Sequence, residues 1–417
     1  MFRAGCVLIA GILTSCSPKV ERTPVGPGAD TTGGPPRATV VVVPRFAARD
    51  SAIVRLLGGA REAAAGATVT LRREGTAAAI TATLDDTGAF VATGMLEGSY
   101  TVAVQRVLTA FEREKLASSV PDADAFVASA SFFVDAPRTD QRPEVSFGRR
   151  GSLILSEVNH STPYDPSTGA EYLNGQYVEL YNNGDTTVYL DGVTIALGLA
   201  TTYDFPNFPC SLYEPMTLDT AGIWADFMWR LPGEGTTYPL RPGQIAVFAS
   251  DAIDHTVFIS SAANLAGAQF EVPSSSGVDN PSVPNASQIG TRTYSYDGGF
   301  RMFHTIPVVV IARRLDVARL EQRLQAGTED LMRARIPADS IYDVVVSRSV
   351  LNRGYNLCPR PIAERFERQM ASVIQAVDSM TLQRRVLYTR DGRKVLQRTG
   401  ATAADFERSV GTPGTLP

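Results

Sequence analysis

The stretch from Gly151 to Leu197 constrains the fold more than any other, because short strand-like runs in it alternate with tight turns. The first run is apolar, and the next two alternate between faces with the period of a half-buried strand. The turns are rich in Asn, Asp and Gly, which tolerate left-handed backbone geometry. The stretch predicts strands at residues 152–158, 176–181 and 193–197, with turns at 182–185 and 191–192.

The N-terminus carries the features of an export signal. A short cationic start precedes the apolar run Cys6–Leu13, which is too short to cross a bilayer as a helix. Leu-Thr-Ser-Cys follows at positions 13–16 and resembles the lipobox of bacterial lipoproteins. The resemblance implies removal of the signal peptide, residues 1–15, and lipidation of Cys16; Ser17 after it favours the outer membrane. The alternative is an ordinary secretory signal with an incidental cysteine.

Residues 16–37 are rich in Pro, Gly and Thr and poor in large aliphatic side chains. Such a segment cannot bury enough apolar surface to fold, so we expect the lipid anchor to be followed by a flexible stalk. No later apolar run is long enough to predict a transmembrane helix. We therefore expect the folded domains to be tethered to the outer membrane through Cys16, facing either the periplasm or the cell surface.

The net charge limits which partners the protein can bind, and the cysteine content bears on whether it contains a disulfide. The 417 residues are enough for two or more domains, and the formal net charge is −4. This charge argues against nucleic acid as the main partner, because phosphate binding needs a concentrated basic surface. Beyond the signal peptide and Cys16, only Cys210 and Cys358 remain. An oxidising envelope allows these two to pair, and two free buried cysteines are equally ordinary.

Residues 38–148 predict a first β domain. Its clearest part, residues 81–104, carries the pattern D-x-G-x-F followed by L-x-x-G-x-Y-x-V. This arrangement is similar to the prealbumin-like, carboxypeptidase-regulatory-type β-sandwich. In that fold each of these positions serves a turn or the core, so the resemblance implies a scaffold without catalytic residues. The charged segment 111–116 predicts a short helix.

Residues 150–417 predict a second β domain. The pattern L-x-x-S-E-V-N, G-Q-Y-V-E-L-Y-N-N-G and V-Y-L-D-G-V-T-I, with residues 240–248 and 398–414, resembles the lamin-tail Ig-like fold. Together with the lipobox, the chain resembles the Bacteroidota lipoprotein family of unknown function known as domain of unknown function 4876. The resemblance implies an envelope location and two β-sandwich domains, the second with long insertions and one or two short helices. No reaction is implied.

The C-terminal third of the chain predicts a mixture of short elements. We expect strands at 303–311 and 341–346, an amphipathic helix at 316–324, a helical or irregular piece at 365–380, and a hairpin around the turn at 391–392.

Two insertions interrupt the second domain, at residues 199–240 and 264–293. The first is dense in aromatic side chains and could form a stacking platform for a glycan, a peptide or a partner protein. The alternative, which we favour, is a local core that pins a long excursion to the sandwich, because excursions of this length otherwise stay disordered. The second insertion predicts a plain surface loop. The candidate binding surface consists of Trp224, Trp229, Tyr203, Phe227 and Tyr213.

Few residues offer catalytic chemistry. Glu157 and Glu179 could face each other on paired strands, the minimum for carboxylate acid–base work, but structural hydrogen bonding is the favoured interpretation. His160 is expected to be an exposed loop histidine. The three histidines show no ligand spacing, and no nucleophile elbow or phosphate loop is present, so we expect no metal site and no cofactor.

These features favour a non-enzymatic envelope lipoprotein that binds an outer-membrane transporter or a glycan. The alternative is a purely structural spacer. A hydrolase that uses Glu157 and Glu179 is a distant third hypothesis.

Overall fold

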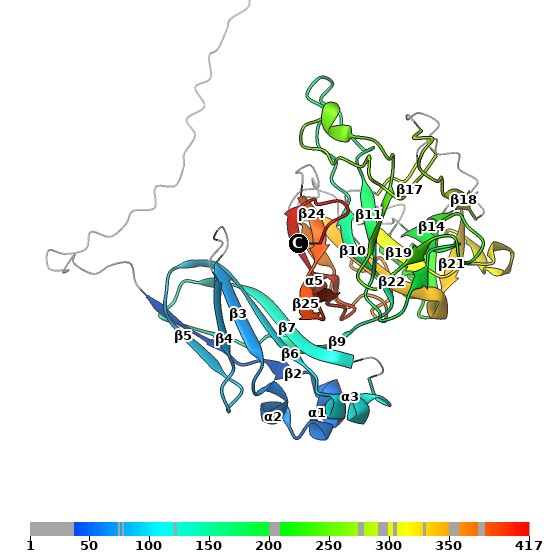
Figure 1. The fold of residues 1–417 in the computed structure, drawn as a ribbon. Helices are drawn as coiled ribbons and strands as arrows, with labels where there is room; N and C mark the ends of the chain where they lie inside the picture. The colour runs from blue at the N-terminus through cyan, green and yellow to red at the C-terminus, as the bar shows by residue number, and fades with distance from the viewer. Residues whose placement is uncertain are drawn as a thin grey trace, which may run out of the picture.

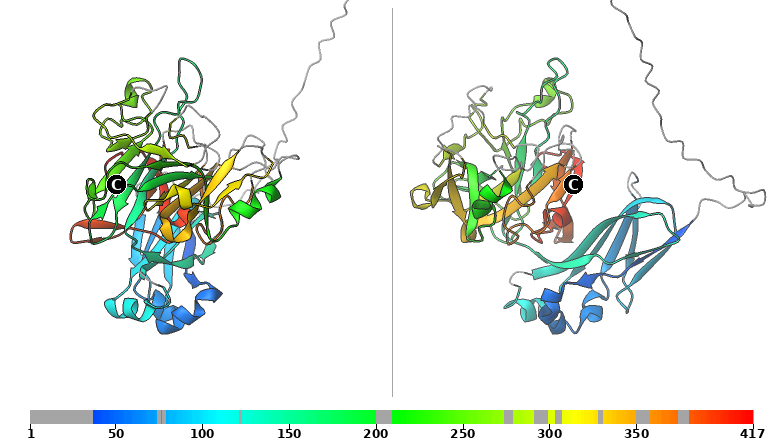
Figure 2. Two further views of the ribbon diagram at one scale, coloured as in Figure 1. Left: turned by 90° about the vertical axis from the view of Figure 1, so that its right-hand side faces the viewer. Right: turned by 180° about the vertical axis from the view of Figure 1, so that it is seen from behind.

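The computed structural model describes residues 37–73, 76, 79–120, 123–199, 209–273, 279–290, 299–302, 307–327, 331–349, 358–373 and 380–416. Cys16, Tyr203 and His304 lie outside these residues. The described chain is mainly β, as the sequence predicted, and forms two bodies joined near residue 150 (Figures 1 and 2). No helix in the described ranges is long and apolar enough to cross a membrane.

The first body is a sandwich of two sheets. Its strands are β1 (Ala38–Val42), β2 (Arg45–Phe46), β3 (Thr68–Arg73), β4 (Ala79–Thr83), β5 (Phe90–Met95), β6 (Gly98–Val107), β7 (Ala123–Val134), β8 (Arg138–Gln141) and β9 (Glu144–Arg149). The smaller sheet has the order β5-β1-β8, and the larger has the order β2-β9-β7-β6-β3-β4. Apolar side chains from both sheets fill one core, which includes Val40, Leu71 and Phe126.

Three short helices close one end of this body: α1 (Ser51–Leu56), α2 (Ala60–Ala64) and α3 (Ala110–Leu116). The predicted helix at 111–116 is confirmed as α3. Its start is fixed by a capping box, in which Thr109 accepts from the backbone of Glu112 and the Glu112 side chain accepts from the backbone of Thr109.

The second body is a larger sandwich. One sheet contains β10 (Leu153–Asn159), β11 (Tyr177–Asn182), β16 (Ile245–Ala249), β17 (Phe270–Glu271), β24 (Met380–Arg384) and β27 (Phe406–Val410). The other contains β13 (Thr194–Gly198), β14 (Gly222–Arg230), β18 (Ser287–Ile289), β19 (Val308–Ala312), β20 (Gln322–Leu324), β21 (Met332–Pro337), β22 (Ile341–Ser349) and β23 (Ala371–Val373). Their orders are β17-β16-β11-β10-β24-β27 and β20-β21-β14-β13-β19-β22-β23, with β18 beside β14.

Smaller elements complete the second body. They are β12 (Val188–Tyr189), β15 (Pro239–Leu240), β25 (Val386–Arg390), β26 (Arg393–Leu396), α4 (Glu214–Thr217) and α5 (Thr402–Asp405), with the 3-10 turns η2 (Cys210–Leu212), η3 (His255–Val257), η4 (Val317–Arg319) and η5 (Ala338–Ser340). A further 3-10 turn, η1 (Ala48–Asp50), belongs to the first body. β10, β11 and β13 each match a predicted strand to within one residue.

The outer face of the β10-β11 sheet is buried, although the sequence predicted a half-buried strand. Val178 and Leu180 point into the sandwich core as expected. Tyr177 packs on the opposite face against a separate apolar cluster from β16 and the loop after it, and Tyr181 packs against Leu396. The extra burial arises because the β25-β26 hairpin, the loops after β16 and the C-terminal segment all cover this face.

Three expectations for the second body are wrong. Residues 199–240 are not only an excursion, because they contain β14, which lies inside the larger sheet. The segment 264–293 is not a plain loop, since it supplies two strands and the fully buried Phe270. Residues 316–324 form a short 3-10 turn and an edge strand instead of an amphipathic helix. In all three cases pairing with distant strands decides the local structure.

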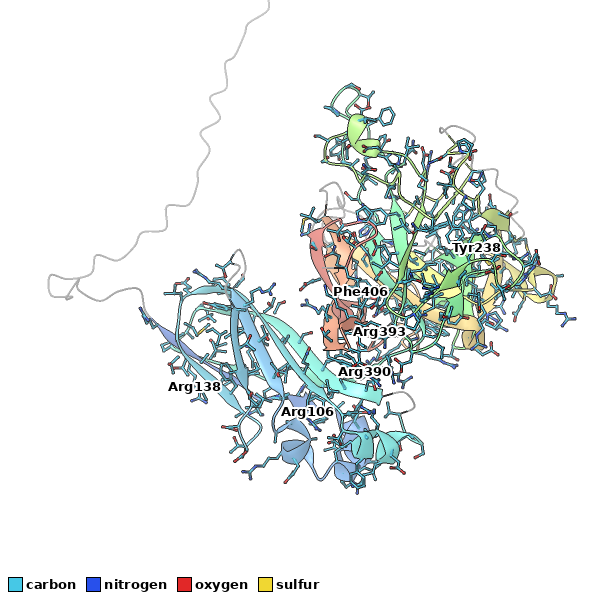
Figure 3. The ribbon with its side chains drawn as sticks, in the orientation of Figure 1. Arg106, Arg138, Tyr238, Arg390, Arg393 and Phe406 are labelled. Carbon is cyan, nitrogen blue, oxygen red and sulfur yellow. A yellow bond between two sulfur atoms is a disulfide. The ribbon has the colours of Figure 1, made fainter. Side chains whose placement is uncertain are left out.

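The β25-β26 hairpin connects the two bodies. Leu387 is completely buried against Ala125 and Val127 of β7. The Tyr388 hydroxyl donates to Asp124 at 2.7 Å, and the same carboxylate pairs with Arg150 at 2.8 Å. Figure 3 shows the hairpin residue Arg390 at this junction. The hairpin therefore holds one end of the larger first-body sheet and leaves the other end facing β27 and β23.

Candidate functional site: the interdomain cleft

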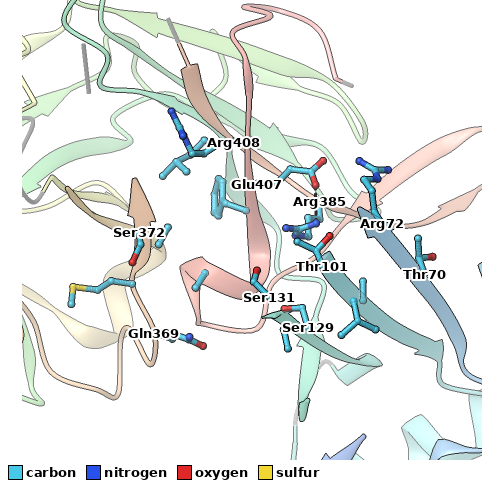
Figure 4. A pocket seen from close by; sticks show the side chains of 18 of the residues that line it. Thr70, Arg72, Thr101, Ser129, Ser131, Gln369, Ser372, Arg385, Glu407 and Arg408 are labelled. Carbon is cyan, nitrogen blue, oxygen red and sulfur yellow. Dashed lines mark hydrogen bonds and ion pairs between the residues drawn. The ribbon is translucent and has the colours of Figure 1, made fainter. Parts of the chain in front are cut away.

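A cleft of about 820 Å³ lies between the two bodies. Its volume falls within the range of about 300–1,000 Å³ that is common for ligand sites. One wall is the outer face of β3, β6 and β7, and the other comes from residues 369–372, 385 and 403–408 (Figure 4). Residues from both domains are therefore needed to form it.

The first wall is built from two cross-strand rows. In one row Thr70, Ala103 and Ser129 are register partners. In the next row Arg72, Thr101 and Ser131 are register partners. Residues two apart on a strand share a face, so both rows point out of the sheet while the alternating aliphatic residues fill the core. The strand period thus places hydroxyls and an arginine on the cleft side.

The second wall carries more charge. Arg385 donates from Nη1 to Glu407 at 2.7 Å, which fixes its guanidinium at the edge of the cleft. The Nε atom of Arg385 is buried and has no hydrogen-bond partner in the described structure. Arg408, the next residue after Glu407 on β27, also lines the cleft and points away from this pair (Figure 4). The other N–H groups of a guanidinium on a cleft wall can donate to an anionic or hydroxyl ligand.

The charge of the lining differs from that of the whole chain. Among the residues that the structure describes, four arginines (Arg72, Arg73, Arg385 and Arg408) and one acidic residue, Glu407, line the cleft. The chain as a whole has a net charge of −4. Because clefts with low-dielectric walls concentrate the field of their lining charges, this region attracts anions on an otherwise acidic protein.

The structure brings Glu157 and Glu179 together, as the strand pattern predicted. They are register partners on β10 and β11, and their exposed fractions are 1% and 0%. Glu157 accepts from the Tyr177 hydroxyl and from Gln383 at 2.9 Å. Glu179 accepts from the Ser156 hydroxyl at 3.1 Å. Both carboxylates are therefore engaged in structural hydrogen bonds.

The C-terminal segment seals this pair from solvent. The backbone of Thr412 donates to Glu157 at 3.2 Å, and that of Gly414 donates to Glu179 at 2.6 Å. Gly411 lies so close that an added Cβ would be 2.8 Å from the Tyr177 hydroxyl. A substrate has no access to the carboxylates while the segment is in place, so the pair is a latch for the C-terminus.

Burial perturbs both carboxyl groups. Loss of solvation, followed by the neighbouring charge of Glu157, raises the pKa of Glu179 from 4.5 to about 8. Loss of solvation also raises the pKa of Glu157, although hydrogen bonds from Tyr177 and Gln383 oppose the shift. The Glu179 carboxyl therefore stays protonated in mildly acidic conditions.

The prediction of an exposed aromatic binding surface is wrong for Trp224, Trp229 and Tyr213, which the structure buries. Trp224 and Trp229 lie on β14 with exposed fractions of 1% and 2%. Trp229 stacks on Phe227 and meets Phe300 edge-on inside the sandwich core. Tyr213 is also buried. The two tryptophans fill cores because β14 is an internal strand, and Phe227 is half-buried against the sandwich core. The burial of the tryptophans agrees with the favoured interpretation of a local core.

Cys210 and Cys358 form a disulfide with a Cα–Cα distance of 5.5 Å. It ties the segment before α4 to the segment that leads to β23. The pairing that the sequence left open is thus present in the structure.

His160 is buried, with an exposed fraction of 2%, so the expectation of an exposed loop histidine is wrong. Gln176 covers it by donating to its backbone carbonyl at 3.3 Å. His255 is also buried, between the Tyr172 hydroxyl at 2.7 Å and the carbonyl of Asp251 at 2.9 Å. Within the described ranges, no three His, Cys, Asp or Glu side chains gather in a way that could hold a metal ion.

Sequence reasoning missed the cleft. Thr101, Ser129 and Ser131 carry no motif, and exposed hydroxyls are ordinary on the outer face of a sheet. The only available signal was the alternation of small polar residues along β7, which does not reveal what the sheet faces.

Comparisons with known proteins identify a family for part of the chain. Residues 241–412 match the model of DUF4876, described as a protein of unknown function. The crystal structure of a DUF4876 family protein from Bacteroides thetaiotaomicron is similar to this chain, with a TM-score of 0.52 and 16% identity, covering 91% of this chain and 98% of that chain.

The major pilin subunit BcpA of Bacillus cereus gives a TM-score of only 0.17 at 8% identity, covering 77% of this chain and 97% of that chain, which is too low to support a structural argument. No curated protein sequence matches. Residues 241–412 thus form a DUF4876 family domain, in a chain that shares its mainly β fold with a solved member of that family.

Proposed function

We propose that the chain is a non-enzymatic lipoprotein of the cell envelope that binds a glycan or an outer-membrane partner in the cleft between its two domains. The cleft is the observation that carries the proposal, because it is built jointly by both domains and lined by polar groups. The sealed state of Glu157 and Glu179 favours this role over hydrolysis.

The lipobox supports the anchoring part of the proposal. Lipidation at Cys16 and the following stalk would hold the two domains near the outer membrane. Replacement of Cys16 by Ser should move the protein from the membrane fraction to the soluble envelope fraction. Retention of that variant in the membrane would contradict lipid anchoring.

A variant that fills the cleft tests the binding part. Ala103 lies at the centre of one cross-strand row, so Ala103→Trp projects a large side chain into the cleft. A matched control is Thr93→Trp, at an exposed position of β5 outside the cleft. Pull-down from detergent-solubilised membranes should recover a partner or glycan with the native chain and the control but lose it with Ala103→Trp. Equal recovery with both variants would place the binding site outside the cleft, and recovery of nothing with any of the proteins would favour the structural spacer.

A further inference from the structure

The geometry points to an acidic glycan, a sugar chain that bears carboxylate or sulfate groups, as the ligand of the interdomain cleft. This inference rests on the proposed function and names the chemistry of its ligand. It follows from three features of the lining: its positive charge, its hydroxyl rows and its lack of an exposed aromatic face.

The charge requires an anionic ligand. Arg72 is exposed on the sheet wall, and the guanidinium of Arg385 lies on the opposite wall. Glu407, the one acidic residue in the described part of the lining, already accepts from Arg385. Guanidinium groups match carboxylate and sulfate oxygens in planar geometry, and their hydrogen bonds to anions are about twice as strong as neutral ones. A neutral sugar chain would leave this charge uncompensated.

The hydroxyl rows require a ligand that both donates and accepts hydrogen bonds. Thr101, Ser129 and Ser131 lie in adjacent rows on one face, and Ser372 faces them from the other wall (Figure 4). Each hydroxyl offers one donor and two acceptor lone pairs, which is also what a sugar hydroxyl offers. An acidic peptide side chain only accepts hydrogen bonds, so it would leave the acceptor lone pairs of these wall hydroxyls unused.

The aromatic content argues against single-stranded nucleic acid as the ligand. Phe406 is the only aromatic residue that lines the described cleft. Its exposed fraction is 3%, and the guanidinium of Arg384 covers its ring at 4.3 Å. Single-stranded nucleic acid is bound by stacking on open aromatic rings, and this cleft offers none. Recognition must therefore come from ion pairs and hydroxyls.

Isothermal titration of the full chain with four probes tests the inference. Polygalacturonate and chondroitin sulfate supply carboxylate and sulfate groups on sugar chains, dextran is a neutral glycan, and poly-L-glutamate is an anionic chain without sugar. We expect binding of polygalacturonate, chondroitin sulfate or both, weakening as salt rises because the charges are partly exposed. Dextran should not bind. Chondroitin sulfate carries carboxylates as well as sulfates, so binding of polygalacturonate would show that carboxylates suffice, and binding of chondroitin sulfate alone would indicate that sulfate is needed.

Three variants assign the binding to the named groups. Arg72→Gln and Arg385→Gln should each weaken binding of the acidic glycan by about tenfold, the value of one charged hydrogen bond. Thr101→Val keeps the side-chain shape and should weaken the acidic glycan by about fivefold without changing any weak binding of poly-L-glutamate. Arg138→Gln is the control, since Arg138 is exposed on β8 away from the cleft (Figure 3). Arg72 is exposed, so its variant should fold even if Arg385→Gln does not.

The outcomes separate the two proposals. Equal binding of dextran and polygalacturonate, or tight binding of poly-L-glutamate that ignores Thr101→Val, would overturn the acidic-glycan inference. So would binding of no acidic glycan. If a partner is still lost on Ala103→Trp in the pull-down, the proposed function stands alone. If no partner depends on the cleft, both fail.

Discussion

Replacing Glu179 by Gln should make the second domain less sensitive to alkaline pH. Glu179 is completely buried and pairs in register with Glu157. Loss of solvation, followed by the charge of Glu157, raises the pKa of Glu179 to about 8 in the folded protein. Gln has the shape of the protonated acid and cannot ionise. The variant therefore keeps the neutral form of this latch at every pH.

The direction of the pH effect follows from the difference between the pKa of Glu179 in the folded protein and its pKa in the unfolded chain. Between pH 4.5 and about 8 the folded state retains a proton that the unfolded chain has released. The stabilisation from this group is thus complete below pH 4.5 and is lost as the pH rises through about 8. Each pH unit in this window costs about 1.4 kcal/mol, so the upper limit at pH 8 is about 5 kcal/mol.

Urea denaturation at pH 5, 6, 7 and 8 measures this dependence. Trp224 and Trp229 are the only tryptophans, and both lie in the second domain, so their fluorescence follows its unfolding. Glu367, whose pKa burial also raises to about 8, adds a parallel slope that remains in the variant. Glu179→Gln should therefore reduce the fall in stability with pH without abolishing it.

The matched control is Glu234→Gln, a glutamate whose side chain is 88% exposed. It should follow the native pH profile. If Glu179→Gln loses the same free energy at every pH and keeps the native slope, the buried charge is not what limits stability, and our reasoning is refuted.

Three further changes probe the second-domain core. Trp229→Ala should cost about 3–5 kcal/mol of unfolding free energy in urea, because the ring is buried between aromatic neighbours, and should leave cleft binding intact. Cys358→Ser removes a crosslink to Cys210 that spans 148 residues and should cost about 2–5 kcal/mol, as should reduction of the native protein. Asp343→Ala leaves Arg384, whose side chain is 1% exposed, with its charge poorly paired, and should cost about 3–5 kcal/mol in thermal and urea unfolding.

Simple outcomes would contradict these three predictions. Phe258→Ala, at a 60% exposed aromatic, is the control for Trp229→Ala and should change stability by less than about 0.5 kcal/mol. A Trp229→Ala protein as stable as this control would place the ring outside the core. Unchanged stability of native protein in reductant would argue against the disulfide. For Asp343→Ala, a loss no larger than that of Phe258→Ala would exclude a buried ion pair.

Local patterns predicted central strands of the two large sheets in the second body. The run before Asn159 and the alternation around Val178 suffice to place β10 and β11, because tight turns and period-two patterning act over a few residues. The same alternation predicted that Glu157 and Glu179 face each other on paired strands. It could not show that the C-terminal segment covers them, since that contact joins residues more than two hundred positions apart.

The aromatic segment shows where local reading fails. Trp224 and Trp229 lie in a run without clean alternation, so composition alone cannot separate an exposed platform from an internal strand. Pairing of β14 with β13, β18 and β21 decides it, and those partners come from three different parts of the chain. The cleft is still harder to predict from the sequence, because the hydroxyls on β7 line a cleft only once the fold places β27 opposite them.

Ligand protection of a single cysteine tests most directly whether the cleft is the binding site. Ser131 is exposed on the cleft wall, and Thr93 is equally exposed on β5 outside it. In the Ser131→Cys and Thr93→Cys proteins, maleimide labelling is followed with and without saturating acidic glycan. We predict that the glycan slows labelling at position 131 and leaves position 93 unchanged. Equal rates at position 131 with and without bound glycan would show that the ligand binds elsewhere and would contradict the account.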